Sequence, residues 1–221
     1  MTKINNRAPS TFVINRSESP VASNIRITIG ENFPPSSRSA FALAQVKMIE
    51  LKLSQGAKPS HGGILPAAKI TPAIAEARGR GPAPWVDCNS PPRHSAFGSP
   101  AELIQFVQQL RELSGGKPIG FKLCVGQPHE FAALCHAMLD ANVAPDFVTV
   151  DGTEGGTGAA PPEFQDSIGM PLAEGLWIVE GFLTGAGLRE EVKVIAAGKI
   201  YNGFSLVRTC LLYTSPSPRD S

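Results

Sequence analysis

Residues 148–161 read VTVDGTEGGTGAAP, which is the most informative stretch of the chain. The β-branched run Val148–Val150 predicts a buried strand that ends on Asp151, and a glycine-rich loop follows it. Few side chains guard such a loop, so its backbone N–H groups can approach a flat or anionic ligand closely. A flexible surface turn is the alternative interpretation. A glycine loop that follows a buried strand is a common design for ligand sites in α/β proteins, which favours a ligand site here.

The chain on either side of this loop alternates between strands and helices. Nearly continuous hydrophobic runs predict strands over 46–53, 119–125, 146–150 and 192–196. Capping residues and helical spacing of apolar residues predict helices over 73–78, 99–113, 128–142 and 171–186, and a further helix that begins at residue 202. This order is typical of buried parallel strands with helices outside them. We therefore expect an α/β fold that is part of a (β/α)8 TIM barrel, with four strands, or five if residues 25–29 form one.

Composition shifts divide the chain into three parts. Residues 1–45 are polar and irregular, and residues 46–209 carry the predicted partial barrel. Residues 210–221 read CLLYTSPSPRDS and break the pattern abruptly. This last segment resembles the in-frame translation of a sequencing-library adapter, which predicts a non-native tail; a natural proline-rich tail is the alternative.

The overall composition indicates an ordinary globular protein. The chain has 221 residues, is 42% hydrophobic and carries a net charge of +1, so neither nucleic acid nor an anionic membrane is an expected partner. It has no apolar run of about 18 residues and no export signal. Its four cysteines form no C-x-x-C pair, which favours reduced thiols in the cytoplasm. His129 and His136 are seven residues apart and His94 is isolated, so we expect no metal site.

The predicted strand ends carry the candidate functional residues. Lys122 lies between Phe121 and Leu123 in a predicted buried strand, so its side chain should point into the barrel or a cleft. Its ammonium either forms a structural salt bridge or binds an electron-rich oxygen of a ligand. Asp151 ends the next strand, and Gly198 ends the last one, where barrels often hold phosphate on backbone amides. We expect all of these groups to meet at one mouth, at the C-terminal ends of the strands.

Several long segments resemble the FMN-binding synthase domain of the glutamate synthase family, and most closely its stand-alone members. These segments are KMIELKLSQGAKPSHGGILPAAKITP (47–72), SPPRHSAF (90–97), GKPIGFKL (116–123), PDFVTVDGTEGGTGAAP (145–161), GMPLAEGL (169–176) and AAGKI (196–200). The resemblance covers about residues 46–208 in order. It implies a β/α barrel that holds FMN and forms L-glutamate from 2-oxoglutarate and ammonia through 2-iminoglutarate, which the flavin reduces. An electron-donor protein is the partner that it implies.

The resemblance also implies roles for individual residues. The catalytic candidates are Lys122, near the flavin pyrimidine edge, and Asp151. The cofactor-binding candidates are Lys52, Gln55, Gly152, Gly155, Gly156, Thr157, Gly158, Gly198 and Lys199. The substrate-binding candidates are Lys58, His61, Gly62 and Gly63. The large synthases carry an acidic residue where His61 stands, and the family's iron–sulfur cluster is not expected in this chain.

Two other interpretations stay open. The chain could come from another FMN β/α-barrel oxidoreductase that acts on a small oxo or hydroxy acid, or it could be a non-catalytic fragment. A half-barrel exposes strand edges and an unfilled interior. We therefore expect an incomplete, inactive fragment that binds FMN weakly.

Overall fold

The computed structural model describes residues 12–15, 25–29, 46–59, 61, 64–77, 82–89, 94, 96–156 and 160–213. Four of the candidate site residues, Gly62, Gly63, Thr157 and Gly158, lie outside the described residues. So does the end of the predicted tail, from residue 214 onward.

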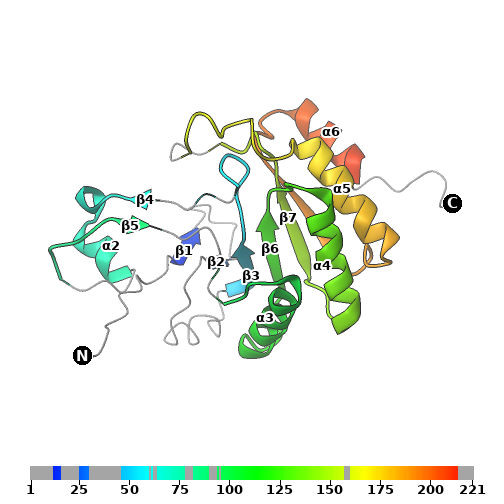
Figure 1. Ribbon diagram of the computed structural model, residues 1–221, viewed down its shortest axis with the longest axis horizontal. Coiled ribbons are helices and arrows are strands. Elements are labelled where there is room, and N and C mark those ends of the chain that lie inside the picture. The colour runs from blue at the N-terminus through cyan, green and yellow to red at the C-terminus, as the bar shows by residue number, and fades with distance from the viewer. Residues whose placement is uncertain are drawn as a thin grey trace.

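The described strands of the main sheet lie in the order β1-β2-β3-β6-β7-β8 (Figure 1). Strand β1 (Phe12–Asn15) is antiparallel to β2 (Ile25–Ile29). The other neighbours pair in parallel, and these strands are β3 (Val46–Lys52), β6 (Ile119–Leu123), β7 (Phe147–Asp151) and β8 (Lys193–Ala197). The sheet stays open, because β8 pairs only with β7 among the described strands. The predicted fold class, a partial barrel of parallel strands with outer helices, is confirmed, and residues 25–29 do form a strand.

The helices cover one face of this sheet (Figure 1). They are α3 (Pro100–Leu113), α4 (Pro128–Ala141), α5 (Leu172–Gly185) and α6 (Gly203–Tyr213). Helix α3 begins where its predicted capping box stands, since the Ser99 side chain accepts a hydrogen bond from the Glu102 backbone N–H at 3.2 Å. Helix α6 begins after Asn202, whose side chain accepts from the Ser205 N–H at 2.7 Å. It continues to Tyr213, so the first residues of the predicted tail are helical, while the origin of that tail stays a prediction.

A small unit between β3 and α3 was not predicted in full. Strands β4 (Ile64–Leu65) and β5 (Cys88–Asn89) form a two-stranded antiparallel sheet. The short 3-10 helix η2 (Ala67–Lys69) and helix α2 (Pro72–Ala77) lie between these strands in sequence, and α2 matches the helix expected from residue 73. This unit lies on the far side of the molecule from α4 and α5 (Figure 1).

The hydrophobic core fills the space between the sheet and its helices. Side chains alternate along a strand, so Phe121, Val148 and Val150 face the helices and are fully or almost fully buried. The opposite, inner face of the same strands carries a different set of side chains. At the C-terminal ends this set is polar, and it consists of Glu50, Lys52, Lys122, Thr149 and Asp151.

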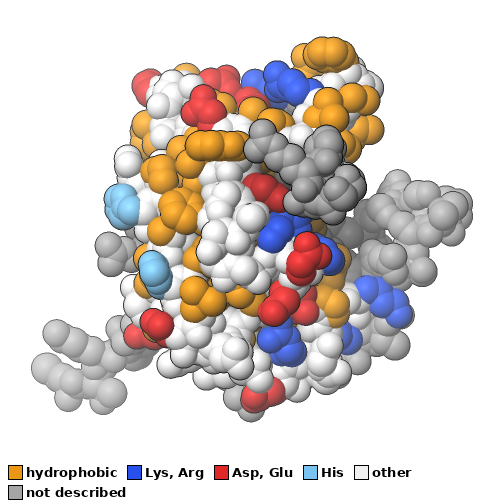
Figure 2. Space-filling model, turned by 90° about the vertical axis from the view of Figure 1, so that its right-hand side faces the viewer, with side chains coloured by type: hydrophobic (Ala, Val, Ile, Leu, Met, Phe, Trp, Pro, Cys, Tyr) orange, Lys and Arg blue, Asp and Glu red, His pale blue; other side chains and the backbone are white. Residues whose placement is uncertain are grey.

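The surface formed by the helices mixes charged and apolar groups (Figure 2). Its large exposed apolar side chains on α5 and α6 are Trp177, Phe204, Leu206, Val207 and Leu211. Among the described residues, no helix is both long enough and apolar enough to cross a membrane.

Neighbouring residues of α5 provide a test of the core. Leu176 is fully buried and Trp177 is 69% exposed. We expect Leu176→Ala to lower the free energy of unfolding by about 2–5 kcal/mol, because it removes buried contacts and leaves a cavity. Trp177→Ala should change it by less than about 0.5 kcal/mol. Urea unfolding measures both values, and equal effects would contradict the described packing of α5.

Candidate functional site

One carboxylate joins three segments at the C-terminal edge of the sheet. Asp151 ends β7 and is 5% exposed. Its Oδ2 atom lies 3.0 Å from Lys122 Nζ on β6 and accepts a hydrogen bond of 3.0 Å from the Gly56 backbone N–H in the loop after β3. Charge-assisted hydrogen bonds of this kind stabilise a buried anion. Sequence reasoning therefore brought Lys122 and Asp151 together correctly, but it assigned no role to Gly56.

Lys122 points to the inner face, as its neighbours predict. Phe121 and Leu123 are buried on the helix side, while the Lys122 side chain remains 21% exposed. In the sheet it pairs in register with Lys52 of β3 and Thr149 of β7. An ammonium group has three N–H donors, and Asp151 is its one partner among the described residues. Lys122 thus forms the salt bridge and keeps donors that a ligand could use.

The glycine-rich loops pack against each other, backbone to backbone. A Cβ atom on Gly56 would lie 1.6 Å from the Gly152 carbonyl oxygen, which excludes any side chain at that position. A Cβ atom on Gly155 would lie 2.4 Å from Asp151 Oδ1. The Ala57 N–H also donates to the Gly155 carbonyl oxygen at 3.1 Å. These glycines therefore allow a close contact between the loops that follow β3 and β7.

Three amides of the loop after β7 form hydrogen bonds within the protein. The Gly152 N–H donates to Ala197 O at 3.0 Å, the Thr153 N–H to Met170 O at 2.9 Å, and the Gly155 N–H to Gly152 O at 2.7 Å. The expectation that this loop offers its amides to a ligand is wrong for these three groups, because each already has a partner. Gly156, which follows them, is exposed.

The end of β8 approaches the same loop. Gly198 has φ +122°, a conformation that favours glycine, and a Cβ atom there would lie 3.3 Å from the Gly152 nitrogen. Gly198 is thus part of the predicted mouth. The Lys199 side chain is more than half exposed, and its ammonium lies 3.5 Å from a carboxylate oxygen of the equally exposed Asp166. An exposed pair of this kind stabilises the fold by about 1 kcal/mol at most.

Lys58 is buried in the loop after β3. It is 7% exposed, and its side chain has no acidic partner in the part of the chain that the structure describes. A lysine whose side chain is mostly packed and has no counter-charge is a suitable binding group for an anion. The other candidates in the loop differ from Lys58. Gln55 is half-buried, and His61 is exposed with its ring edge-on to Phe164 at 5.4 Å.

Sequence reasoning missed several polar residues next to these candidates. Glu50 is 3% exposed and accepts a hydrogen bond of 2.7 Å from the Thr149 hydroxyl. Ser54 accepts the Cys124 N–H at 2.8 Å, and both Glu154 carboxylate oxygens accept the Leu172 N–H at the start of α5. Glu50 could have been found from strand alternation, because it lies two residues before Lys52 on the same face.

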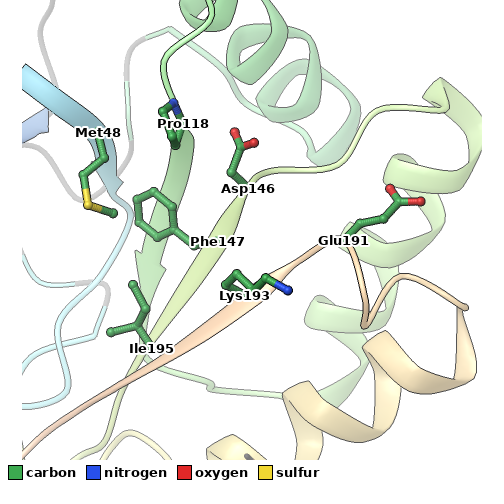
Figure 3. A pocket seen from close by; sticks show the side chains of 7 residues that line it. All are labelled: Met48, Pro118, Asp146, Phe147, Glu191, Lys193 and Ile195. Carbon is green, nitrogen blue, oxygen red and sulfur yellow. The ribbon is translucent and has the colours of Figure 1, made fainter.

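A hollow of about 360 Å³ lies at the other end of the sheet (Figure 3). It is lined by Met48, Pro118, Asp146, Phe147, Glu191, Lys193 and Ile195. Most of these residues belong to the N-terminal ends of the strands or to the residues just before them, so the hollow is remote from Lys122 and Asp151. Asp146 is held by Arg111 at 2.9 Å and by the Ile119 N–H at 2.8 Å, which gives it a structural role.

Comparisons with known proteins decide the family. A family model described as a conserved region in glutamate synthase matches residues 37–214. The chain belongs to the glutamate synthase family. It is 41% identical over 170 residues to the glutamate synthase large subunit-like protein YerD of Bacillus subtilis, which covers 77% of this chain and 31% of that protein. It is 33% identical over 165 residues to the archaeal-type glutamate synthase (NADPH) of Thermotoga maritima, covering 74% of this chain and 31% of the relative.

A third relative gives the same result. The archaeal glutamate synthase (NADPH) of Methanocaldococcus jannaschii is 38% identical over 153 residues, which covers 69% of this chain and 29% of that protein. The chain therefore spans about a third of the length of the curated relatives it matches. The resemblance to the glutamate synthase family is confirmed, while the roles of individual residues stay predictions.

The loop contact at Gly56 can be tested by adding one methyl group. We expect Gly56→Ala to lower the free energy of unfolding by about 1–3 kcal/mol, because the loop must move away from Gly152 and weaken the bond to Asp151. Gly181→Ala is the matched control, since Gly181 lies in α5 with open space around it. That change should raise the stability by up to about 1 kcal/mol. Urea unfolding of both variants decides, and a neutral Gly56→Ala would contradict the contact.

The buried thiols supply a test with pH. Burial raises the pKa of Cys124 to about 11 and that of Cys135 to about 11. Because these values exceed the ordinary value of 9.0, the stability that the two thiols contribute is complete below pH 9 and is lost as the pH rises towards 11. At pH 8 we expect iodoacetamide to alkylate both residues about 100-fold more slowly in the folded chain than in urea. Mass spectrometry of the peptides measures the rates, and equal rates would contradict this burial.

Proposed function

We propose that this chain contributes the flavin and substrate site of a glutamate synthase-type oxidoreductase. The reaction is the FMN-dependent reduction of 2-iminoglutarate, formed from 2-oxoglutarate and ammonia, to L-glutamate. The observation that carries the proposal is Lys58, a lysine that is only 7% exposed and has no acidic partner among the described residues. It lies in the loop whose Gly56 is bonded to Asp151, so it belongs to the same strand edge as the Lys122–Asp151 pair.

The residues at this edge fit FMN. The Lys122 side chain stays 21% exposed beside the packed loops, so its ammonium can donate to polar atoms along one edge of a flat ring. Gly198 lies against the same loop and is the candidate for the phosphate end. When bound and reduced by an electron donor, FMN would supply the hydride that reduces a carbon–nitrogen double bond.

The residues of the chain have separate tasks in this proposal. Lys122 donates hydrogen bonds to a polar ring edge and stabilises electron density that collects there. Lys58 binds a carboxylate of the substrate through a charge-assisted hydrogen bond. Asp151 orients Lys122 and holds the loop that carries Lys58, through the bond to Gly56. An electron-donor protein is the proposed macromolecular partner. We propose a cytoplasmic location, which the buried thiols of Cys124 and Cys135 support.

One observation favours a second candidate, an FMN-dependent oxidoreductase that acts on another small oxo or hydroxy acid. His61 is exposed and lies edge-on to Phe164, and the resemblance to the large synthases implies an acidic residue at its position. A different residue at that position can change which acid the loop accepts. Comparing 2-oxoglutarate with monocarboxylic oxo acids as ligands separates the two candidates.

Substitution of Lys58 tests the proposal. The 221-residue chain should bind FMN saturably, though weakly, and 2-oxoglutarate should bind to the FMN-loaded chain. Lys58→Met should weaken 2-oxoglutarate binding at least about 10-fold, because it removes a charge-assisted bond. It should not lower the stability of the free chain, since no acidic partner among the described residues is lost and the methionine keeps most of the apolar stem. Flavin fluorescence and calorimetry measure binding, and urea unfolding measures stability.

The control is Lys69→Met, because Lys69 is an exposed lysine in η2. This variant should bind both ligands like the unchanged chain. The proposal fails if the chain shows no saturable FMN binding, or if Lys58→Met and Lys69→Met bind 2-oxoglutarate equally well.

A further inference from the structure

The Thr153 side chain is buried without a hydrogen-bond partner. Thr153 is 6% exposed, and its hydroxyl oxygen bonds to nothing in the part of the chain that the structure describes. A buried hydroxyl that is left unsatisfied costs about 1–3 kcal/mol, so such groups are rare and call for an explanation. Thr149 provides the contrast within the same segment, because it is 2% exposed and its hydroxyl donates to Glu50.

Thr153 lies close to the candidate site in sequence and in space. It is two residues after Asp151, and its backbone nitrogen would lie 3.2 Å from a Cβ atom on Gly56. Its own N–H donates to Met170 O, which fixes the backbone of the residue. Thr153 is therefore held between the loop after β3 and the segment before α5, beside the Lys122–Asp151 pair.

The other polar side chains nearby already have protein partners. Ser54 accepts the Cys124 N–H, and Glu154 accepts the Leu172 N–H. Asp151 is bonded to Lys122 and Gly56. The polar side chains around Thr153 thus have hydrogen-bond partners within the protein, whereas the Thr153 hydroxyl has none among the described residues. This is the pattern expected of a group whose hydrogen-bond partner is a ligand.

We propose that the Thr153 hydroxyl is a ligand-binding group that donates a hydrogen bond to a carbonyl or carboxylate oxygen. This inference rests on the proposed function and adds a residue to its site. An oxygen acceptor is the matching chemistry, because the neighbouring Lys122 ammonium can only donate hydrogen bonds. Two sources carry such an oxygen: a ring carbonyl of FMN, and the oxo or carboxylate groups of a 2-oxo acid.

The experiment compares three variants of the full chain. Thr153→Val removes the hydroxyl and keeps the shape, Thr153→Ser keeps a hydroxyl, and Thr149→Val removes a hydroxyl that has a partner. FMN is titrated by flavin fluorescence, and 2-oxoglutarate is titrated into the FMN-loaded chain by calorimetry. Urea unfolding of the free chain is measured for each variant.

Thr153→Val should leave the free chain as stable as before or more stable, because it removes an unsatisfied polar group. It should weaken the binding of one ligand about 5- to 10-fold, and the ligand whose affinity falls identifies the source of the oxygen. Thr153→Ser should keep most of the affinity. Thr149→Val should destabilise the chain, because it leaves the buried Glu50 carboxylate without this donor.

Two results would overturn the inference alone. Unchanged affinity of Thr153→Val for both ligands would show that the hydroxyl does not contact them. A loss of stability like that of Thr149→Val would show that the hydroxyl is satisfied inside the free protein. If the unchanged chain binds neither ligand, the proposed function fails, and this inference fails with it.

Discussion

A single carboxylate oxygen, Asp151 Oδ2, holds the C-terminal edge of the sheet together. It binds the Lys122 ammonium on β6 and the Gly56 amide in the loop after β3, while Asp151 itself ends β7. Breaking a buried ion pair from one side costs about 3–5 kcal/mol, because the remaining charge has no solvent to replace its partner. The geometry of the candidate site and the stability of these three segments therefore depend on the same contacts. Asp151 therefore fixes the position of the Lys122 ammonium before any ligand binds to it.

The glycines around this carboxylate are required by close packing, which cannot be seen from the sequence pattern. Gly56 and Gly152 touch backbone to backbone, and Gly155 fits against the Asp151 carboxylate where a side chain would collide. Because the amides of Gly152, Thr153 and Gly155 are bonded within the protein, they cannot also bind an anion. Recognition at this edge consequently falls to side chains. Among the described side chains at this edge, Lys58, Lys122 and Thr153 have donors to spare.

Local patterns predicted the parts of the fold that depend on local physics. Helices α3, α4 and α5 lie within two residues of their predicted bounds, because capping residues and apolar spacing act over a few positions. Strands β1, β4 and β5 were missed, since segments of two to four residues carry too little periodicity to be seen and depend on a distant partner. The site followed the same division. The direction of Lys122 could be read from Phe121 and Leu123, whereas the bond between Gly56 and Asp151 spans 95 positions and left no local signal.

The two lysines at this edge are suited to different ligand groups. Lys122 already shares its charge with Asp151, so a neutral polar edge can accept its remaining hydrogen bonds without a large change in charge balance. Lys58 has no acidic partner among the described residues and gains most from a group that is itself anionic. A flavin ring edge matches the first description and a substrate carboxylate the second. Loop packing that fixes Gly56 against Asp151 then keeps both binding groups on one side of the sheet, and a bound acid would in turn stabilise the loop that carries Lys58.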